Sequence, residues 1–138
     1  MRKVLVVTAL LLFAGIAFGQ TLKSGNMVAV HHYDIILQPD VTSNQLLEFF
    51  ETTYIPTFEK VFPGTKVYTL VGERGDQIHK IGGMIIFDSK ETRDKIYPEA
   101  GGGLQMNEEQ QKAMQMLNEG INKLVLSISS VYTDWMVQ

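Results

Sequence analysis

The feature that most restricts the fold of this chain is the order of its strand-like and helix-like hydrophobic patterns. Apolar and β-branched runs predict four strands, over Met27–Leu37, Lys66–Glu73, Gln77–Phe87 and Val131–Val137. Apolar residues three and four apart predict helices over Thr42–Phe62, Lys90–Tyr97 and Glu108–Val125. Because Arg74-Gly75-Asp76 forms the turn between the second and third strands, the order is strand, helix, hairpin, helix, strand.

Local signals sharpen this interpretation. Thr42 and Gln45 have the spacing of a capping box, which places the start of the first helix. Pro56 interrupts the apolar stripe of that helix and predicts a kink near its end. Gly82 and Gly83 lie inside the third predicted strand and indicate a bulge or a close approach to the backbone.

The order β-α-β-β-α-β within one domain predicts a ferredoxin-like α+β fold, a four-stranded antiparallel sheet with helices on one face. In this topology the first and third strands lie in the middle, which agrees with their being the most apolar. The face without helices then needs a second cover. Two copies related by a two-fold axis, sheet against sheet, would supply it, so we expect a homodimer.

The N-terminus predicts export. Arg2 and Lys3 precede an apolar run over residues 4–18, and Ala17-Phe18-Gly19 has the small-x-small pattern of a cleavage site. We therefore expect a signal peptide over 1–19, a short leader over 20–26 and one domain over 27–138. After cleavage the domain is expected to be periplasmic or secreted and not bound to the membrane. The alternative is a retained membrane anchor, for which the apolar run is short.

Composition excludes several classes of function. The formal net charge of −3 falls to −5 once Arg2 and Lys3 are removed, which argues against a nucleic-acid partner. The chain has no cysteine, so disulfides, cysteine-ligated zinc, iron–sulfur clusters and thiol catalysis are excluded. No phosphate-binding loop or nucleophile elbow is present. We expect no cofactor.

The three histidines are the main candidates for polar chemistry. His31 and His32 are adjacent on a predicted strand and point to opposite faces, so they cannot share one metal ion. Either could meet His79 on the neighbouring strand, with Asp34 or Asp76 nearby, in a metal or acid–base site. The alternative, which we favour, is hydrogen-bonded histidines within the sheet, and we expect no metal.

Three stretches resemble a known superfamily. The segment His32–Pro39 resembles its first strand and following turn, Phe50–Phe58 resembles its first helix with a proline near the end, and Ile85–Asp94 resembles its third strand and charged helix. The family is the dimeric α/β-barrel superfamily, which includes antibiotic-biosynthesis monooxygenases, NIPSNAP-like proteins and stress-responsive barrel proteins. The resemblance implies that two ferredoxin-like subunits form a barrel.

The resemblance also implies possible chemistry. Haem-degrading members use a histidine on a helix as axial ligand, and neither long predicted helix here has one. Cofactor-independent oxygenases of the superfamily hold an aromatic substrate in a cavity lined largely by apolar groups. Aromatic residues that could belong to such a lining are Tyr33, Tyr68, Tyr132 and Trp135.

Our leading hypothesis is that the domain binds a small apolar or aromatic molecule in a barrel cavity. The predicted ligand-binding residues are His31, Tyr33, His79 and Trp135. One alternative is a cofactor-independent monooxygenase of the antibiotic-biosynthesis type. Another is a non-catalytic interaction module of the cell envelope. The flexible segment Gly101–Gly103 is expected to be a surface loop.

Overall fold

The computed structural model describes residues 21–98 and 106–138. The predicted signal peptide (1–19) and Gly101–Gly103 lie outside the described residues. The strands are β1 (Met27–Leu37), β2 (Thr65–Val71), β3 (Ile81–Phe87) and β4 (Val125–Met136). The helices are α1 (Ser43–Phe49), the π-helical turn η1 (Phe50–Tyr54), α2 (Ile55–Val61), α3 (Lys90–Ile96) and α4 (Glu108–Asn122).

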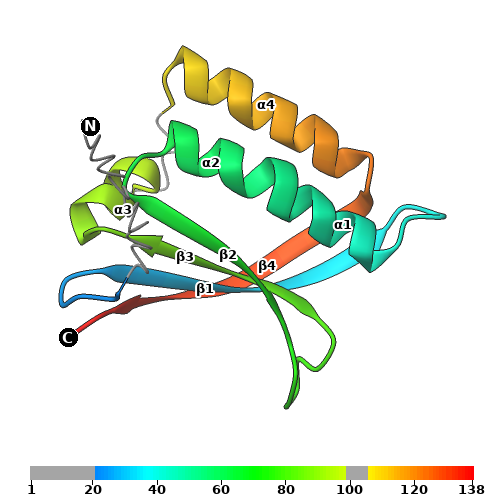
Figure 1. Cartoon of the computed structure of the whole chain (residues 1–138), viewed down its shortest axis with the longest axis horizontal. Helices are drawn as coiled ribbons and strands as arrows, with labels where there is room; N and C mark the ends of the chain where they lie inside the picture. Colours follow the sequence, from blue (N-terminus) through cyan, green and yellow to red (C-terminus); the bar gives the residue numbers. More distant parts are fainter. Residues whose placement is uncertain (1–20, 99–105) are drawn as a thin grey trace, which may run out of the picture.

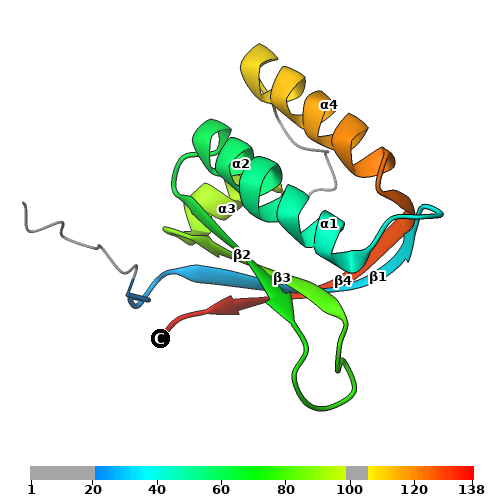
Figure 2. The same ribbon diagram turned by 45° about the vertical axis from the view of Figure 1, so that its right-hand side comes forward.

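The four strands form one antiparallel sheet in the order β2-β3-β1-β4. The helices cover one face, and the other face carries no element of this chain in the described ranges (Figures 1 and 2). This order, with β1 and β3 in the middle, confirms the predicted ferredoxin-like α+β fold. We call this uncovered side of the sheet the open face.

The first long helix is irregular where the sequence predicts a kink. Thr42 and Gln45 form the predicted capping box at the start of α1. Pro56 in the first turn of α2 has no N–H to donate to the preceding turn. The turn before it is π-helical, and the N–H of Ile55 donates to the carbonyl of Phe50. The proline is therefore accommodated by a widened turn.

The last helix and strand differ from the prediction. α4 ends at Asn122 rather than Val125, and β4 begins at Val125 rather than Val131. The error has a physical reason, because Leu124 and Ile128 are four residues apart and fit a helical stripe equally well. In the structure Ile128 pairs with Ile35 of β1. Hydrogen bonding to β1 therefore selects the strand, with its period of two residues, over the helix, with its period of 3.6.

The core lies between the sheet and the helices. Its fully buried side chains are Leu46, Phe58, Phe62, Phe87 and Leu117. Phe49 of α1 packs closely on α4, where a Cβ on Gly120 would lie 2.5 Å from the ring. This core holds the helices against one face of the sheet.

Candidate functional site

The residues of β1 alternate between the two faces of the sheet. Ile35 and Leu37 pack with Leu46 of α1, so they face the helices. By the period of two along a strand, His31 and Tyr33 face the helices as well. His32 lies on the open face and is exposed. The prediction that His31 and His32 point to opposite faces is therefore confirmed.

β1 and β3 separate in the middle of the sheet. Their pairing ends at His32↔Gly82, whereas β1 remains paired with β4 through Leu37. Beyond this point β2 and β3 leave the sheet together, on the side away from the helices, and residues 72–80 connect them (Figure 2). A gap therefore opens between residues 33–37 of β1 and this β2–β3 connection.

The prediction that the third strand begins at Gln77 is wrong. β3 begins at Ile81, and His79 lies in the connection with a φ of 64°. The N–H of His79 donates to the carbonyl of Gly72 at 2.7 Å, and that of Lys80 donates to the carbonyl of Gln77 at 3.0 Å. Since these groups bond within the connection, they do not continue the ladder to β1.

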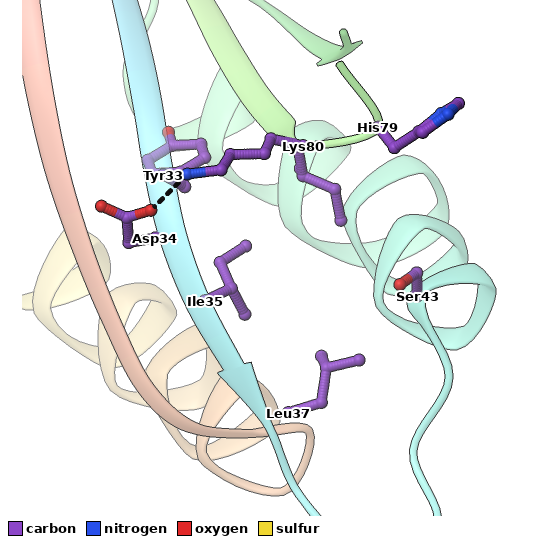
Figure 3. Close-up of a pocket in the computed structure, with 8 residues that line it drawn as sticks. Tyr33, Asp34, Ile35, Leu37, Ser43, His79 and Lys80 are labelled. Atoms are coloured by element: carbon purple, nitrogen blue, oxygen red, sulfur yellow. Dashed lines mark hydrogen bonds and ion pairs between the residues drawn. The ribbon is translucent and has the colours of Figure 1, made fainter. Parts of the chain in front are cut away.

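The gap contains a hollow of about 200 Å³ (Figure 3). Residues of β1, α1, β3 and the connection line it: Tyr33, Asp34, Ile35, Leu37, Ser43, His79, Lys80 and Ile81. Its walls are apolar where β1 meets the helix layer. The Nζ atom of Lys80 lies 2.9 Å from Oδ1 of Asp34 and bridges the gap at the rim. Both partners are largely exposed, so this ion pair contributes little stability.

Tyr33 is the polar group that burial affects most at this hollow. Burial raises the pKa of its phenol to about 12, so the hydroxyl is a neutral donor at physiological pH. Within residues 21–98 and 106–138, no hydrogen bond to this hydroxyl is found. The phenol lies over Gly83, where a Cβ would be 2.7 Å from Oη. The predicted close approach at the glycine pair is confirmed here.

His31 lies behind Tyr33 in a row of stacked rings. Its ring centroid is 5.8 Å from that of Tyr33 and 5.1 Å from that of Tyr132 on β4. Its Nδ1 atom is buried and has no hydrogen-bond partner among the described residues. Burial lowers the pKa of His31, and the carboxylate of Asp134 partly offsets this, so the ring is neutral at pH 7.

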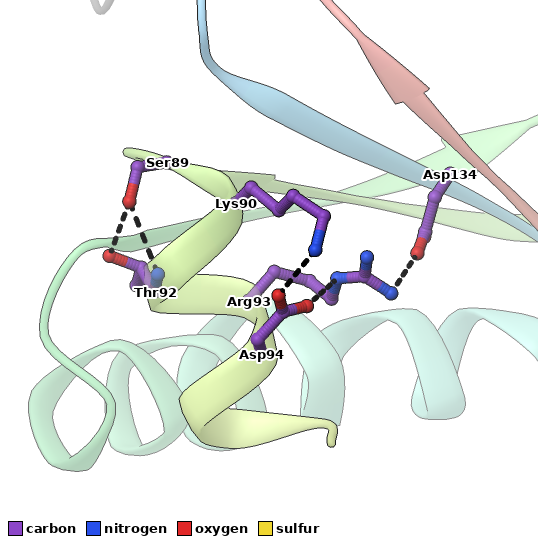
Figure 4. A network of polar contacts seen from close by, with 6 residues as sticks. All are labelled: Ser89, Lys90, Thr92, Arg93, Asp94 and Asp134. Carbon is purple, nitrogen blue, oxygen red and sulfur yellow. Dashed lines mark hydrogen bonds and ion pairs between the residues drawn. The ribbon is translucent and has the colours of Figure 1, made fainter. Parts of the chain in front are cut away.

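A polar network ties α3 to this end of β4. The Nη1 atom of Arg93 lies 2.9 Å from Oδ2 of Asp134, and its Nε atom lies 2.9 Å from Oδ1 of Asp94 (Figure 4). Ser89 caps α3 by accepting from the N–H of Thr92 at 3.1 Å. Arg93 and Asp134 are largely buried, so this pair holds the carboxylate that acts on His31 in a fixed position.

The predicted site residues fall into three groups. His31 and Tyr33 lie together on the helix-covered face. His79 lines the same hollow as Tyr33, but from the connection rather than from a strand. Trp135 pairs with Val28 on the open face and is 61% exposed, so it does not join them. Tyr68 likewise pairs with Met84 on the open face.

Sequence reasoning missed two polar contributors to the hollow, Lys80 and Ser43, as well as its apolar lining residues Ile35, Leu37 and Ile81. Lys80 was part of the predicted strand, and only the spatial separation of β1 and β3 brings it to Asp34. The described part of the chain has no group of three or more side chains placed to share a metal ion. Within the same residues, no helix is both long enough and apolar enough to cross a membrane.

Three solved structures align with most of this chain at low sequence identity. An uncharacterized NIPSNAP-like domain protein from Burkholderia xenovorans aligns with a TM-score of 0.48 and 14% identity, over 84% of this chain and 87% of its own. An ethyl tert-butyl ether D family protein from Bacillus halodurans aligns with a TM-score of 0.46 and 17% identity, over 80% and 99%. A dimeric protein of unknown function with a ferredoxin-like fold from Bacteroides fragilis gives 0.43 and 13%, over 83% and 100%.

No protein-family model and no curated protein matches the sequence. The assignment of this chain to the ferredoxin-like α+β class follows from its own strand order and from the helices on one face. The candidate site in this fold is the hollow where β1 and β3 separate.

Proposed function

We propose that this domain binds a small, mainly apolar or aromatic molecule in the hollow between β1, α1 and the β2–β3 connection. The observation that carries the proposal is the half-buried Tyr33 side chain at the wall of a hollow, whose neutral hydroxyl has no hydrogen-bond partner among the described residues. A bound acceptor would give this donor a partner. The hollow lies on the helix-covered side, whereas the cavity expected from the sequence lay between paired sheets.

The size and lining of the hollow define the ligand class. Ligand pockets for drug-sized molecules measure about 300–1,000 Å³, so about 200 Å³ suits a compound of one or two rings. Ile35, Leu37 and Ile81 offer apolar contacts, and Tyr33 offers one donor. The rim carries Lys80, paired with Asp34, which leaves no net charge there to attract an ion. An uncharged aromatic molecule with one oxygen acceptor fits best.

The test compares phenol with toluene, which have nearly the same shape and differ in the oxygen. Binding to residues 21–138 is followed by amide NMR shifts, which should map to β1 and the start of β3. Tyr33→Phe should weaken phenol binding about fivefold, the loss of one hydrogen bond of about 1 kcal/mol, and leave toluene binding unchanged. Tyr68→Phe is the matched control, since Tyr68 lies on the open face.

Three results would contradict the proposal. One is the absence of saturable shifts around the hollow with either compound. Another is an equal effect of Tyr33→Phe and Tyr68→Phe on phenol binding. The third is that Tyr33→Phe weakens the binding of toluene as much as the binding of phenol. The hydroxyl of Tyr33 would then not be bonded to the oxygen of the ligand.

The open face supports the further proposal of a homodimer. Apolar side chains that are not fully buried lie on it from all four strands: Val30, Ile36, Tyr68, Leu70, Met84, Val131 and Trp135. Val131 and Trp135 are 75% and 61% exposed, and a second sheet would remove such a surface from water. Leu70→Lys, on the β2 edge of this face, should lower the mass measured by sedimentation from dimer to monomer. We also propose export with loss of residues 1–19, which the intact mass of the secreted product tests.

A second candidate function is cofactor-independent oxidation of an activated aromatic compound. The observation that favours it is His31, a neutral imidazole whose buried Nδ1 has no partner among the described residues and can accept a proton. Oxygen uptake with quinol substrates tests it. Uptake that is absent, or unchanged by His31→Ala, Tyr33→Ala and His79→Ala, rules it out.

A further inference from the structure

A second hollow lies on the open face of the sheet. Its volume is about 430 Å³, and residues of β1, β4 and the β2–β3 connection line it. Two of them, His32 and Val131, are paired across β1 and β4, and both side chains are on the open face. The hollow described first is on the helix-covered side. We call the two the open-face hollow and the helix-side hollow.

The two hollows meet at the gap between β1 and β3. Tyr33, Asp34 and Lys80 line both of them. The β1–β3 register ends at His32↔Gly82, so in the described part of the chain no strand pairs with this side of residues 33–37. Three residues shared by hollows on opposite faces, at a place where pairing does not close the sheet, indicate a passage through it. We call this passage the neck.

An ion pair, rather than backbone, crosses the neck. The Nζ atom of Lys80 lies 2.9 Å from Oδ1 of Asp34, beside the phenol of Tyr33 (Figure 3). The side chains of Lys80 and Asp34 are 49% and 76% exposed, so water solvates both when they separate. An exposed pair of this kind contributes little stability and is easily displaced. The neck can therefore open without any change in the strands.

The sizes of the two hollows suit two parts of one molecule. Pockets for drug-sized ligands measure about 300–1,000 Å³, a range that includes the open-face hollow but not the helix-side hollow of about 200 Å³. The smaller hollow has room for a ring and little more. Because Tyr33 lines both hollows, a ring bonded to its hydroxyl lies next to the neck. A side chain on that ring can then enter the open-face hollow.

The polar groups of the open-face hollow favour an uncharged side chain on the ligand. The charges of Lys80 and Asp34 offset each other. Gln77 and Thr133 also line this hollow, and an amide and a hydroxyl each both donate and accept hydrogen bonds. An alcohol or an amide on the ligand has the same two capacities. A carboxylate or an ammonium group would instead have to compete for one partner of an existing ion pair.

We propose that the two hollows form one site for an aromatic molecule with an uncharged, hydrogen-bonding side chain. The ring lies in the helix-side hollow, and the side chain passes through the neck into the open-face hollow. This rests on the function proposed for the helix-side hollow and narrows its ligand class. One copy of the chain builds both hollows, so the site does not depend on the proposed dimer.

Phenols with a three-carbon side chain test the proposal. The ortho, meta and para isomers of hydroxyphenylpropanol and of propylphenol are titrated into the protein, and the isomer that binds best is used. NMR should show one molecule bound per chain. Intermolecular NOEs should join its ring protons to the methyl groups of Ile35, and its side-chain protons to those of Val131 and Thr133. Since these methyl groups lie on opposite faces of the sheet, only a molecule in the neck gives both sets.

Two variants measure the contribution of the open-face hollow. Gln77→Ala removes an amide, so it should weaken hydroxyphenylpropanol binding about fivefold and leave phenol and propylphenol unchanged. Val131→Trp fills the hollow from a position that is 75% exposed, and should weaken both three-carbon compounds about tenfold without affecting phenol. Ile36→Trp is the matched control, because Ile36 is 60% exposed on the same face and lines neither hollow.

Circular dichroism verifies that each variant is folded, and if Val131→Trp is unfolded, Gln77→Ala decides. A charged analogue, the hydroxyphenylpropionate of the same isomer, should bind more weakly than the alcohol. Tighter binding of the propionate would overturn the assignment of an uncharged side chain.

The outcomes separate this proposal from the one on which it rests. If phenol binds in the helix-side hollow but the side-chain protons show no NOE to Val131 or Thr133, the extended site is wrong and the proposed function stands. Equal effects of Val131→Trp and Ile36→Trp on the three-carbon compounds have the same consequence. If phenol itself does not bind, the proposed function fails, and the extended site fails with it.

Discussion

Replacing Tyr33 with phenylalanine should make the protein less sensitive to alkali. The phenol of Tyr33 has a pKa of about 12 in the fold, against an ordinary value of 10.0. Because the folded value is the higher one, the neutral phenol stabilises the fold fully below pH 10. This contribution is lost as the pH rises from 10 to 12. Two pKa units correspond to about 2.7 kcal/mol in total, of which about 1.4 kcal/mol is lost by pH 11.

Urea unfolding of the wild type and of Tyr33→Phe at pH 8, 9, 10 and 11 measures this effect. At pH 8 the two should differ by less than about 1 kcal/mol, since the hydroxyl removed has no partner within the described residues. Between pH 9 and 11 the wild type should lose about 1 kcal/mol more than the variant. Burial also raises the pKa values of Tyr54 and Tyr97, but those contributions are common to both proteins and cancel. Two parallel curves would refute the burial of this phenol.

Three further substitutions test the geometry around the hollow. Gly83→Ala places a Cβ 2.7 Å from the hydroxyl of Tyr33, so phenol binding should fall about fivefold by calorimetry while the fold is retained. Gly72→Ala places a Cβ 1.7 Å from the backbone oxygen of Gln77, so the connection must shift and urea unfolding should show a loss of about 3 kcal/mol. The fold lowers the pKa of His31 and so favours its neutral ring, and the wild type therefore loses stability as the pH falls below 6.5. His31→Phe should lose less free energy of unfolding over this range. An equal loss in the two proteins would contradict this.

The sequence correctly predicted elements whose ends are marked by local signals such as turn residues and helix caps. β1 spans Met27–Leu37 as predicted, because its β-formers end at a turn containing Pro39 and the capping box at Thr42 follows. The errors occur where one pattern fits two structures. Leu124 and Ile128 satisfied a helical period, and residues 77–80 extended the alternation of the third strand although their backbone bonds within the connection.

The candidate site was predictable only in part, for a related reason. Alternation along β1 placed His31 and His32 on opposite faces without knowledge of any partner strand. The face of Trp135, in contrast, depends on its register with β1, and the sequence contains no local signal for that register. Lys80 enters the site only because β3 leaves β1, which is a property of two strands together.

The glycine pair explains why the hollow forms at this point of the sheet. Gly83 is paired with His31, and its missing side chain leaves room for the phenol of Tyr33 on the helix-covered face. Gly82 is the last residue of β3 that pairs with β1, and a Cβ there would lie 2.9 Å from the carbonyl oxygen of His31. One glycine thus admits the buried donor, and the other allows close approach at the last pair before the strands part. Both requirements are steric, and a larger residue at Gly82 or Gly83 would meet neither without movement of its neighbours. These two glycines therefore fix both the place of the Tyr33 hydroxyl and the place where β1 and β3 separate.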